Sequence, residues 1–281
     1  MVETYRPESL LEALEIRSRG ALPFGGGTDL MVARRGYTGS LPRFDGTLLF
    51  TDRVAELRRV TVAEDVMEIG AAVTMTELLD HPETPALLRE ALALIAAPGI
   101  RNRATLGGNI GNASPAGDSL VPLYLYDTQV ELRSLTGTRT LPLKELISGV
   151  RRLTLGKDEL ITRILLPLTD FSFTRYRKVG TRRANALSKL SFAGALTLGD
   201  DGTIKDLRIA LGAVAPTVVR QEDTEQTFLG IPLKTVNPDE AARKWADAVT
   251  PIDDQRSTAA YRKQVALNLI AGFIRKAQEE L

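Results

Sequence analysis

Residues 101–118, with the sequence RNRATLGGNIGNASPAGD, form the part of the chain richest in glycine and asparagine. Glycine lets the backbone approach a bound group closely, and asparagine, serine and threonine supply hydrogen-bond donors. A long polar loop inside a compact chain is usually functional. Asp118 precedes the apolar run LVPLYLY, so it also fits the N-cap of a following helix. Both interpretations stay open, and the density of backbone donors favours a phosphate-bearing cofactor.

A second glycine-rich segment occupies residues 24–30 and reads FGGGTDL. It directly follows ALPF, which the pattern predicts to be a strand. Glycines at this place let backbone N–H groups come close to an anionic group such as a pyrophosphate. The segment lacks the third glycine of G-x-G-x-x-G, and the chain has no G-x-x-x-x-G-K-[ST], so neither common phosphate-binding fingerprint applies. Taken alone, a glycine triplet is more often an ordinary turn.

The first fifty residues alternate helix and strand signals, as at the start of an α/β unit. Ser9 begins an apolar-periodic helix, and Thr74 with Glu77 forms a capping box for a short one. Near the C-terminus, one helix is predicted to contain Trp245 and another to cover about residues 254–280.

The predicted strands divide the chain into two halves. The first half contains LLFTD, VMEIGAAVT, QVELRS and KDELITRILLP. The second half contains FSFTRYRKV and two strands joined by an Asp201–Gly202 turn, as expected for an antiparallel sheet. The best boundary gives domains 1–168 and 169–281, and the first of these has subdomains of about 1–52 and 53–168.

Composition excludes several classes of protein. With 43% hydrophobic and 25% charged residues the chain is globular, and its net charge of +1 offers no field for nucleic acid. Because it has no cysteine, it holds no disulfide, catalytic thiol or cysteine-ligated iron–sulfur cluster. His81 is the only histidine and lies at a polar helix-to-turn junction, so a surface role is expected rather than a metal site or catalytic triad.

The location expected from the sequence is the cytoplasm. The N-terminus MVETYRPESLLEALE has no signal-peptide core. The longest apolar stretches fall short of the roughly 20 residues that a membrane span requires.

Taken together, the two glycine-rich segments resemble the flavin-binding motifs of the FAD subunits of the xanthine dehydrogenase and carbon monoxide dehydrogenase family, the molybdenum hydroxylases. The family's first motif is matched by PFGGGTDL and its second, almost residue for residue, by RNRATLGGNIGNASPAGD. A weaker resemblance is K-x-x-x-R-R, matched by residues 178–183. The acidic pair that often follows in relatives is replaced by Asn185 and Ala186, which puts an acidic contribution there in doubt.

The resemblance covers essentially the whole chain and implies its fold class. That fold is α+β, with a two-part FAD-binding domain of the PCMH type. A C-terminal domain of the carbon monoxide dehydrogenase flavoprotein type follows, with an antiparallel sheet and helices.

The resemblance also implies which residues bind the cofactor. The first motif would wrap the pyrophosphate, with the glycines and Thr28 as donors, while Gly108 and Asn109 would flank the phosphate and ribityl chain. Asp118 would hold the adenosine end, and Lys178 would lie close to the flavin. No catalytic side chain is implied. The cofactor-binding positions are Leu22, Pro23, Phe24, Gly25, Gly26, Gly27, Thr28, Asp29, Leu30, Ile95, Thr105, Gly108, Asn109, Asn112, Asp118, Ile161 and Lys178.

The function implied is electron transfer within a heteromeric oxidoreductase. FAD on this chain would take electrons from 2Fe-2S clusters on a small iron–sulfur subunit and pass them to NAD+, a quinone or another acceptor. A large partner subunit would hold the molybdenum cofactor. Two alternatives stay open: a self-contained FAD-dependent reductase, similar to the enolpyruvyl-UDP-N-acetylglucosamine reductases, and an assembly subunit that has lost flavin.

Overall fold

The structure is a computed structural model that describes residues 2–37, 39–182 and 184–281. Its contacts divide the chain into two compact units. Unit 1 contains Met1–Thr84, Ala96–Ser114 and Asp127–Leu168, and unit 2 contains Pro85–Ile95, Pro115–Tyr126 and Thr169–Leu281. Two internal segments of the N-terminal half therefore pack with the C-terminal half. Within the described residues, no helix combines the length and apolar character that a membrane span needs.

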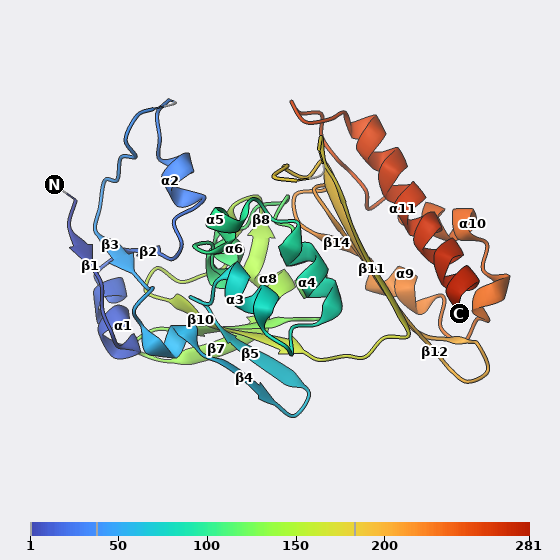
Figure 1. Ribbon diagram of the computed structural model, residues 1–281, viewed down its shortest axis with the longest axis horizontal. Coiled ribbons are helices and arrows are strands. Elements are labelled where there is room, and N and C mark those ends of the chain that lie inside the picture. Colours follow the sequence, from blue (N-terminus) through green and yellow to red (C-terminus); the bar gives the residue numbers. More distant parts are fainter. Residues whose placement is uncertain (1, 38, 183) are drawn as a thin grey trace. The chain divides into compact units, whose positions relative to one another are not determined.

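Unit 1 begins with a small parallel sheet in the order β1-β3-β2 (Figure 1). As predicted, Ser9 caps the first helix, because its hydroxyl accepts the N–H of Glu12. The apolar face of that helix packs on a core that includes Leu49 and Leu57. The elements are β1 Thr4–Tyr5, α1 Leu10–Ser18, β2 Leu22–Phe24, α2 Leu30–Ala33, β3 Leu48–Phe50 and η1 Ala55–Arg58.

The rest of unit 1 is built on a five-stranded antiparallel sheet in the order β4-β5-β10-β6-β7. The predicted capping box of Thr74 and Glu77 is confirmed at the start of α3. The strands are β4 Val60–Ala63, β5 Val66–Gly70, β6 Gln129–Arg133, β7 Thr138–Pro142 and β10 Leu160–Pro167, with the small pair β8 Ile147–Gly149 and β9 Arg152–Leu153. The helices are α3 Met75–Asp80, α5 Pro98–Arg101, α6 Leu106–Asn112 and α8 Leu143–Leu146.

Unit 2 is an antiparallel sheet in the order β11-β12-β13-β14 with helices on both faces. Successive side chains of a strand point to opposite faces. Phe192 of β12 packs on Phe273 of the long C-terminal helix, whereas Ser191 faces the side of α7. The elements are α4 Ala86–Ala93, α7 Leu120–Leu125, β11 Phe173–Val179, β12 Leu190–Leu198, β13 Ile204–Gly212, β14 Val219–Arg220, α9 Glu222–Gln226, η2 Leu233–Thr235, α10 Pro238–Arg243 and α11 Ala259–Glu280.

The α+β fold class is confirmed, and so is the Asp201–Gly202 turn between two antiparallel strands. Both C-terminal helices are shorter than predicted. Helix α10 ends before Trp245, whose N–H bonds three residues back to Ala242 in a tighter turn. Helix α11 begins later than predicted because Asp254 is held in a separate turn, where its N–H and carbonyl pair with Ser257.

Candidate flavin-binding site

The glycine segment after β2 carries a run of free backbone donors. The N–H groups of residues 25–30 have no hydrogen-bond acceptor among the residues that the structure describes. Gly27 has φ +74°, and a Cβ there would lie 2.3 Å from the Phe24 ring, so only glycine fits. Consecutive unpaired N–H groups form a concave anion-binding surface. The segment therefore fits a pyrophosphate on its own geometry.

The second glycine motif uses its backbone donors differently. Thr105 caps α6 by accepting the N–H of Gly108 at 3.0 Å. The two preceding amides are also taken: Leu106 donates to the carbonyl of Val73, and Gly107 to that of Ala71, each at 3.0 Å. The amides of Leu106 and Gly107 thereby anchor the start of α6 to the segment that follows β5. The sequence suggested phosphate contacts from backbone donors in both motifs, but in the second motif the amides of Leu106, Gly107 and Gly108 are bonded within the protein.

Close backbone approach joins the two motifs within unit 1. A Cβ built on Gly26 would lie 1.8 Å from the Arg103 carbonyl oxygen, so the two segments are in direct contact. The side-chain amide of Asn112 donates to the Asp29 carboxylate at 3.1 Å, across 83 residues of sequence. The second motif therefore acts as the support that holds the first in place.

A cavity of about 290 Å³ opens beside this junction. Both motifs line it, through Gly25, Gly26 and Thr105, and its charged lining residues are Asp52, Arg58, Glu77 and Arg103. Arg103 was quoted in the motif but not predicted as a site residue. The fold brings its backbone against Gly26 of the first motif.

Three further predicted positions lie in unit 2, and two of them contact each other. The Lys178 ammonium lies 2.7 Å from the Asp118 carboxylate and donates to the Leu94 carbonyl at 2.9 Å. Both charged side chains are only 8% exposed, and Ser188 donates a short hydrogen bond to Asp118. Asp118 is therefore not a helix cap, because Ser119 is the residue that precedes α7. The two predicted positions are therefore direct neighbours within unit 2.

Two buried hydroxyls accompany this ion pair and were not predicted. Tyr176 is 2% exposed and Ser191 is fully buried, and neither hydroxyl has a well-formed hydrogen bond among the described residues. Burial, and then the negative charge of Asp118, raise the pKa of Tyr176 well above its usual value. Tyr176 thus stays a neutral phenol beside the pair.

The two predicted apolar positions, Ile161 and Ile95, belong to different units. Ile161 lies near Gly111 of α6 and is half-buried. Ile95 ends the α4 segment of unit 2. In the third motif, the Arg182 guanidinium donates to the Asn185 carbonyl, so this arginine holds its own turn. Arg183 lies outside the described residues.

Comparison with known families matches both halves of the chain. Residues 1–169 match the family described as "FAD binding domain in molybdopterin dehydrogenase". Residues 175–277 match "CO dehydrogenase flavoprotein C-terminal domain".

Individual proteins are similar over almost the full length. The xanthine dehydrogenase FAD-binding subunit of Escherichia coli O157:H7 is 30% identical over 98% of this chain and 94% of its own. The glyceraldehyde dehydrogenase medium chain of Sulfolobus acidocaldarius is 29% identical over 92% of each chain. A solved structure of carbon monoxide dehydrogenase from Hydrogenophaga pseudoflava superposes with a TM-score of 0.87 at 26% identity, covering 98% of this chain and 96% of that one.

Proposed function

Because the chain belongs to the family of FAD-binding medium subunits of molybdenum hydroxylases, we propose that it relays electrons inside such a complex. Its FAD takes electrons from an iron–sulfur partner subunit and delivers them to NAD+, a quinone or another acceptor. FAD supplies the redox chemistry when bound, and the protein binds and orients it. No side chain of this chain is assigned a proton-transfer step.

The observation that carries the proposal is the row of N–H groups over residues 25–30, which have no acceptor in the part of the chain that the structure describes. A pyrophosphate bound there accepts hydrogen bonds that the protein itself leaves unmade. Hydrogen bonds to charged groups contribute roughly 1.5–3 kcal/mol each, so two or three of them hold the cofactor firmly.

The buried pair of Lys178 and Asp118 is proposed to serve the flavin end of the cofactor. The lysine keeps its ammonium in place through both Asp118 and the Leu94 carbonyl. A fixed cation favours negative charge on a nearby ring system. Placed beside the isoalloxazine, Lys178 would stabilise its reduced, anionic form.

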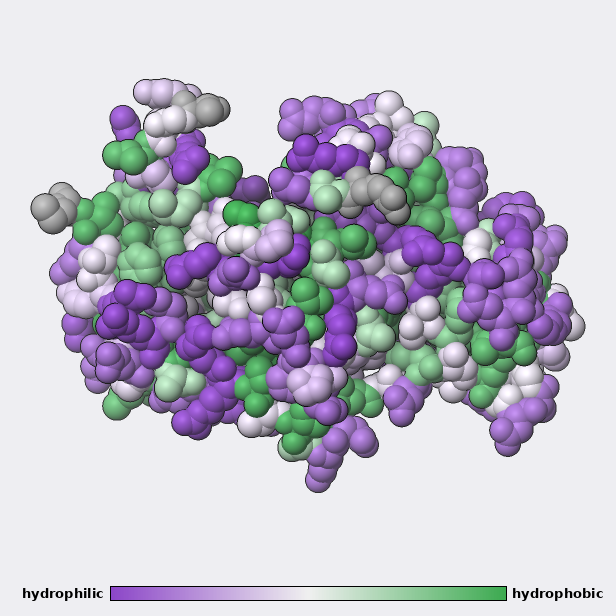
Figure 2. Space-filling view, viewed as in Figure 1, coloured by the Kyte–Doolittle hydropathy of each residue, from purple (hydrophilic) through white to green (hydrophobic). Residues whose placement is uncertain are grey.

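Assembly with partners is supported by composition and by the surface of one segment. A chain without cysteine cannot ligate an iron–sulfur cluster through thiolates, so the electron donor is on another polypeptide. The segment that contains α2 also exposes Val32, Tyr37 and Leu41, at 63%, 77% and 85%. In Figure 2 it projects at the upper left and carries green, apolar residues. We propose that these exposed apolar side chains contact a partner subunit.

Purification from the native source tests the proposal. We expect the tagged chain to co-purify with larger and smaller partners, with molybdenum and iron in the complex, and with about one FAD per copy of this chain. A chain that purifies alone and oxidises NADH with a small substrate would instead be a self-contained reductase. A colourless chain that takes up no added FAD would be an assembly subunit. Either result overturns the proposal.

A further inference from the structure

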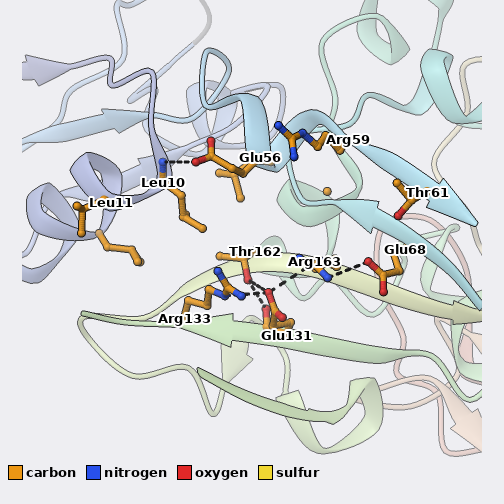
Figure 3. A pocket seen from close by; sticks show the side chains of 13 residues that line it. Leu10, Leu11, Glu56, Arg59, Thr61, Glu68, Glu131, Arg133, Thr162 and Arg163 are labelled. Atoms are coloured by element: carbon orange, nitrogen blue, oxygen red, sulfur yellow. Dashed lines mark hydrogen bonds and ion pairs between the residues drawn. The ribbon is translucent and has the colours of Figure 1, made fainter. Parts of the chain in front are cut away.

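The carboxylates on the sheet side of one cavity in unit 1 have donors within the protein (Figure 3). This cavity has a volume of about 490 Å³ and lies beside strands β5, β6 and β10. Arg163 donates to Glu68 at 2.8 Å. The Thr162 hydroxyl donates to Glu131 at 2.7 Å. Some buried hydroxyls of unit 2, in contrast, have no such partner among the described residues.

Tyr176 belongs to a group of polar residues on one face of the sheet in unit 2. It lies two residues before Lys178 in β11, so the two side chains point to the same face. Strand pairing places Ser191 of β12 directly opposite Lys178, and Gly212 of β13 directly opposite Ser191. The hydroxyls of Tyr176 and Ser191 and the ammonium of Lys178 therefore share the face on which α7 packs.

Glycine at position 212 leaves room for the Ser191 hydroxyl. A Cβ there would lie 2.5 Å from the Oγ of Ser191 and 2.7 Å from a side-chain carbon of Val121 in α7. Any side chain at this position would displace the hydroxyl or the helix. Gly212 thus keeps the Ser191 hydroxyl within the buried group.

Tyr176 and Ser191 each bring a buried hydroxyl that needs a partner. Tyr176 is 2% exposed, Ser191 is fully buried, and neither hydroxyl has a well-formed hydrogen bond among the described residues. The large majority of buried polar side-chain groups form at least one hydrogen bond. Burial is the main cause that raises the pKa of Tyr176; the charge of Asp118 raises it further, and the Ser191 hydroxyl lowers it. These directions fit a chain in which Ser191 donates to the Tyr176 oxygen and Tyr176 donates to the Asp118 carboxylate.

The Asp118 carboxylate can accept this further hydrogen bond. It lies 2.7 Å from the Lys178 ammonium and accepts a short hydrogen bond from Ser188. An ionised carboxylate has about four lone-pair sites, so two donors leave room for a third. The neutral phenol of Tyr176 keeps its proton and can supply that donor.

We propose that Tyr176 is a positioning residue of the flavin site: its hydroxyl donates to Asp118 and so holds this carboxylate, and through it the Lys178 ammonium, in one orientation. Because Tyr176 is only 2% exposed, it acts on a bound flavin only through these two residues. This role rests on the proposed place of Lys178 beside the isoalloxazine. Without the phenol donor, Lys178 is held less firmly and stabilises the reduced, anionic flavin less.

NMR of the full chain tests the contact with Asp118. The chain has six tyrosines, so labelling each Cζ with ¹³C gives few signals, and Tyr176→Phe identifies the one from Tyr176. We expect Asp118→Asn to shift this signal, because a neutral amide is a weaker acceptor than a carboxylate. Tyr126→Phe is the matched control and should leave the Tyr176 signal in place, because Tyr126 is also buried in unit 2 but packs on Phe171.

The midpoint potential of the flavin, measured with FAD at saturation, tests the effect on the cofactor. Lys178→Met should lower the potential, because the reduced, anionic flavin loses its cation. Tyr176→Phe should lower it by about 15–30 mV, which corresponds to a roughly threefold to tenfold change for a two-electron couple. Ser188→Ala removes a donor that already bonds Asp118 and should act in the same direction. In the Lys178→Met background, Tyr176→Phe should cause no further decrease.

Three results would overturn this role for Tyr176 while leaving the proposed function intact. They are an unmoved Tyr176 signal in Asp118→Asn, an unchanged potential in Tyr176→Phe while Lys178→Met lowers it, and an equal decrease by Tyr176→Phe whether or not Lys178 is present. If Lys178→Met itself left the potential unchanged, the proposed place of Lys178 at the flavin would be wrong as well.

Discussion

Substitution of Gly26 by alanine tests how the two glycine motifs hold the cofactor. The added Cβ would lie 1.8 Å from the carbonyl oxygen of Arg103 and 2.9 Å from the Cα of Ala104. Both are backbone atoms, so neither can rotate away. Because real Cβ atoms essentially never lie closer than 3.0 Å, the two segments must separate by at least about 1.2 Å.

A displacement of that size affects the donors of the first motif. Hydrogen bonds to a phosphate oxygen require donor–acceptor distances near 2.7–3.2 Å. Losing one charge-assisted bond raises the Kd about 10- to 150-fold, and losing two raises it more than about 100-fold. We therefore expect Gly26→Ala to fold but to lose most of its FAD.

Visible absorbance of the purified chain and quenching of flavin fluorescence on titration measure the effect. Gly46→Ala is the matched control, because its Cβ meets no atom within 4 Å and its φ is not positive. Circular dichroism checks that both variants are folded. If Gly26→Ala bound FAD within about threefold of the natural chain, the contact between the motifs would not position the donors, and the reasoning would be refuted.

Two further predictions concern buried charge. Lys178→Met should lower FAD affinity about tenfold, because it removes the ammonium proposed to lie at the flavin. Asp118→Asn should have a similar effect, because it removes the carboxylate that holds this lysine in place. Unchanged FAD affinity in both variants would show that the pair does not contribute to the site. Asp254→Asn should lower the free energy of unfolding at pH 7 by about 3 kcal/mol, because it leaves Arg262, with a 3% exposed side chain, without its counter-ion. Hydrogen bonds from Arg262 hold the pKa of Asp254 below its ordinary value, so this stabilisation is present at neutral pH and is lost as pH falls below about 4. Urea unfolding across that range measures it, with Asp239→Asn, an exposed partner in an ion pair, expected to change stability by less than about 1 kcal/mol.

The local structure that short-range chemistry determines was predictable from the sequence. Ser9 and the Thr74–Glu77 capping box act through hydrogen bonds within three residues, so their types and spacing suffice. The end of α10 before Trp245 was not predictable, because apolar periodicity continues while the backbone tightens. The residues next to Asp254 likewise do not indicate that it forms an ion pair with Arg262 and lies in a turn before α11.

The sequence identified the two glycine-rich segments of the candidate site, but not the contacts by which the second segment holds the first. Sequence gives each glycine without saying whether its amide is free. Only the fold shows that the N–H groups of Gly107 and Gly108 are bonded within the protein, whereas those of residues 25–30 have no acceptor among the described residues. The contact between Asp118 and Lys178 joins positions 60 residues apart, so no spacing rule reveals it.

The interleaving of the two units has a consequence for biosynthesis. Helices α4 and α7 come early in the chain but pack on β11, β12 and β13, which follow residue 168. Every residue of α7 is buried. At about 5–20 residues per second, a ribosome exposes these apolar helices for several seconds before their sheet is made. A nascent chain of this protein therefore exposes apolar surface and is prone to aggregate halfway through translation. A fragment that ends at residue 168 would expose the same apolar surface permanently.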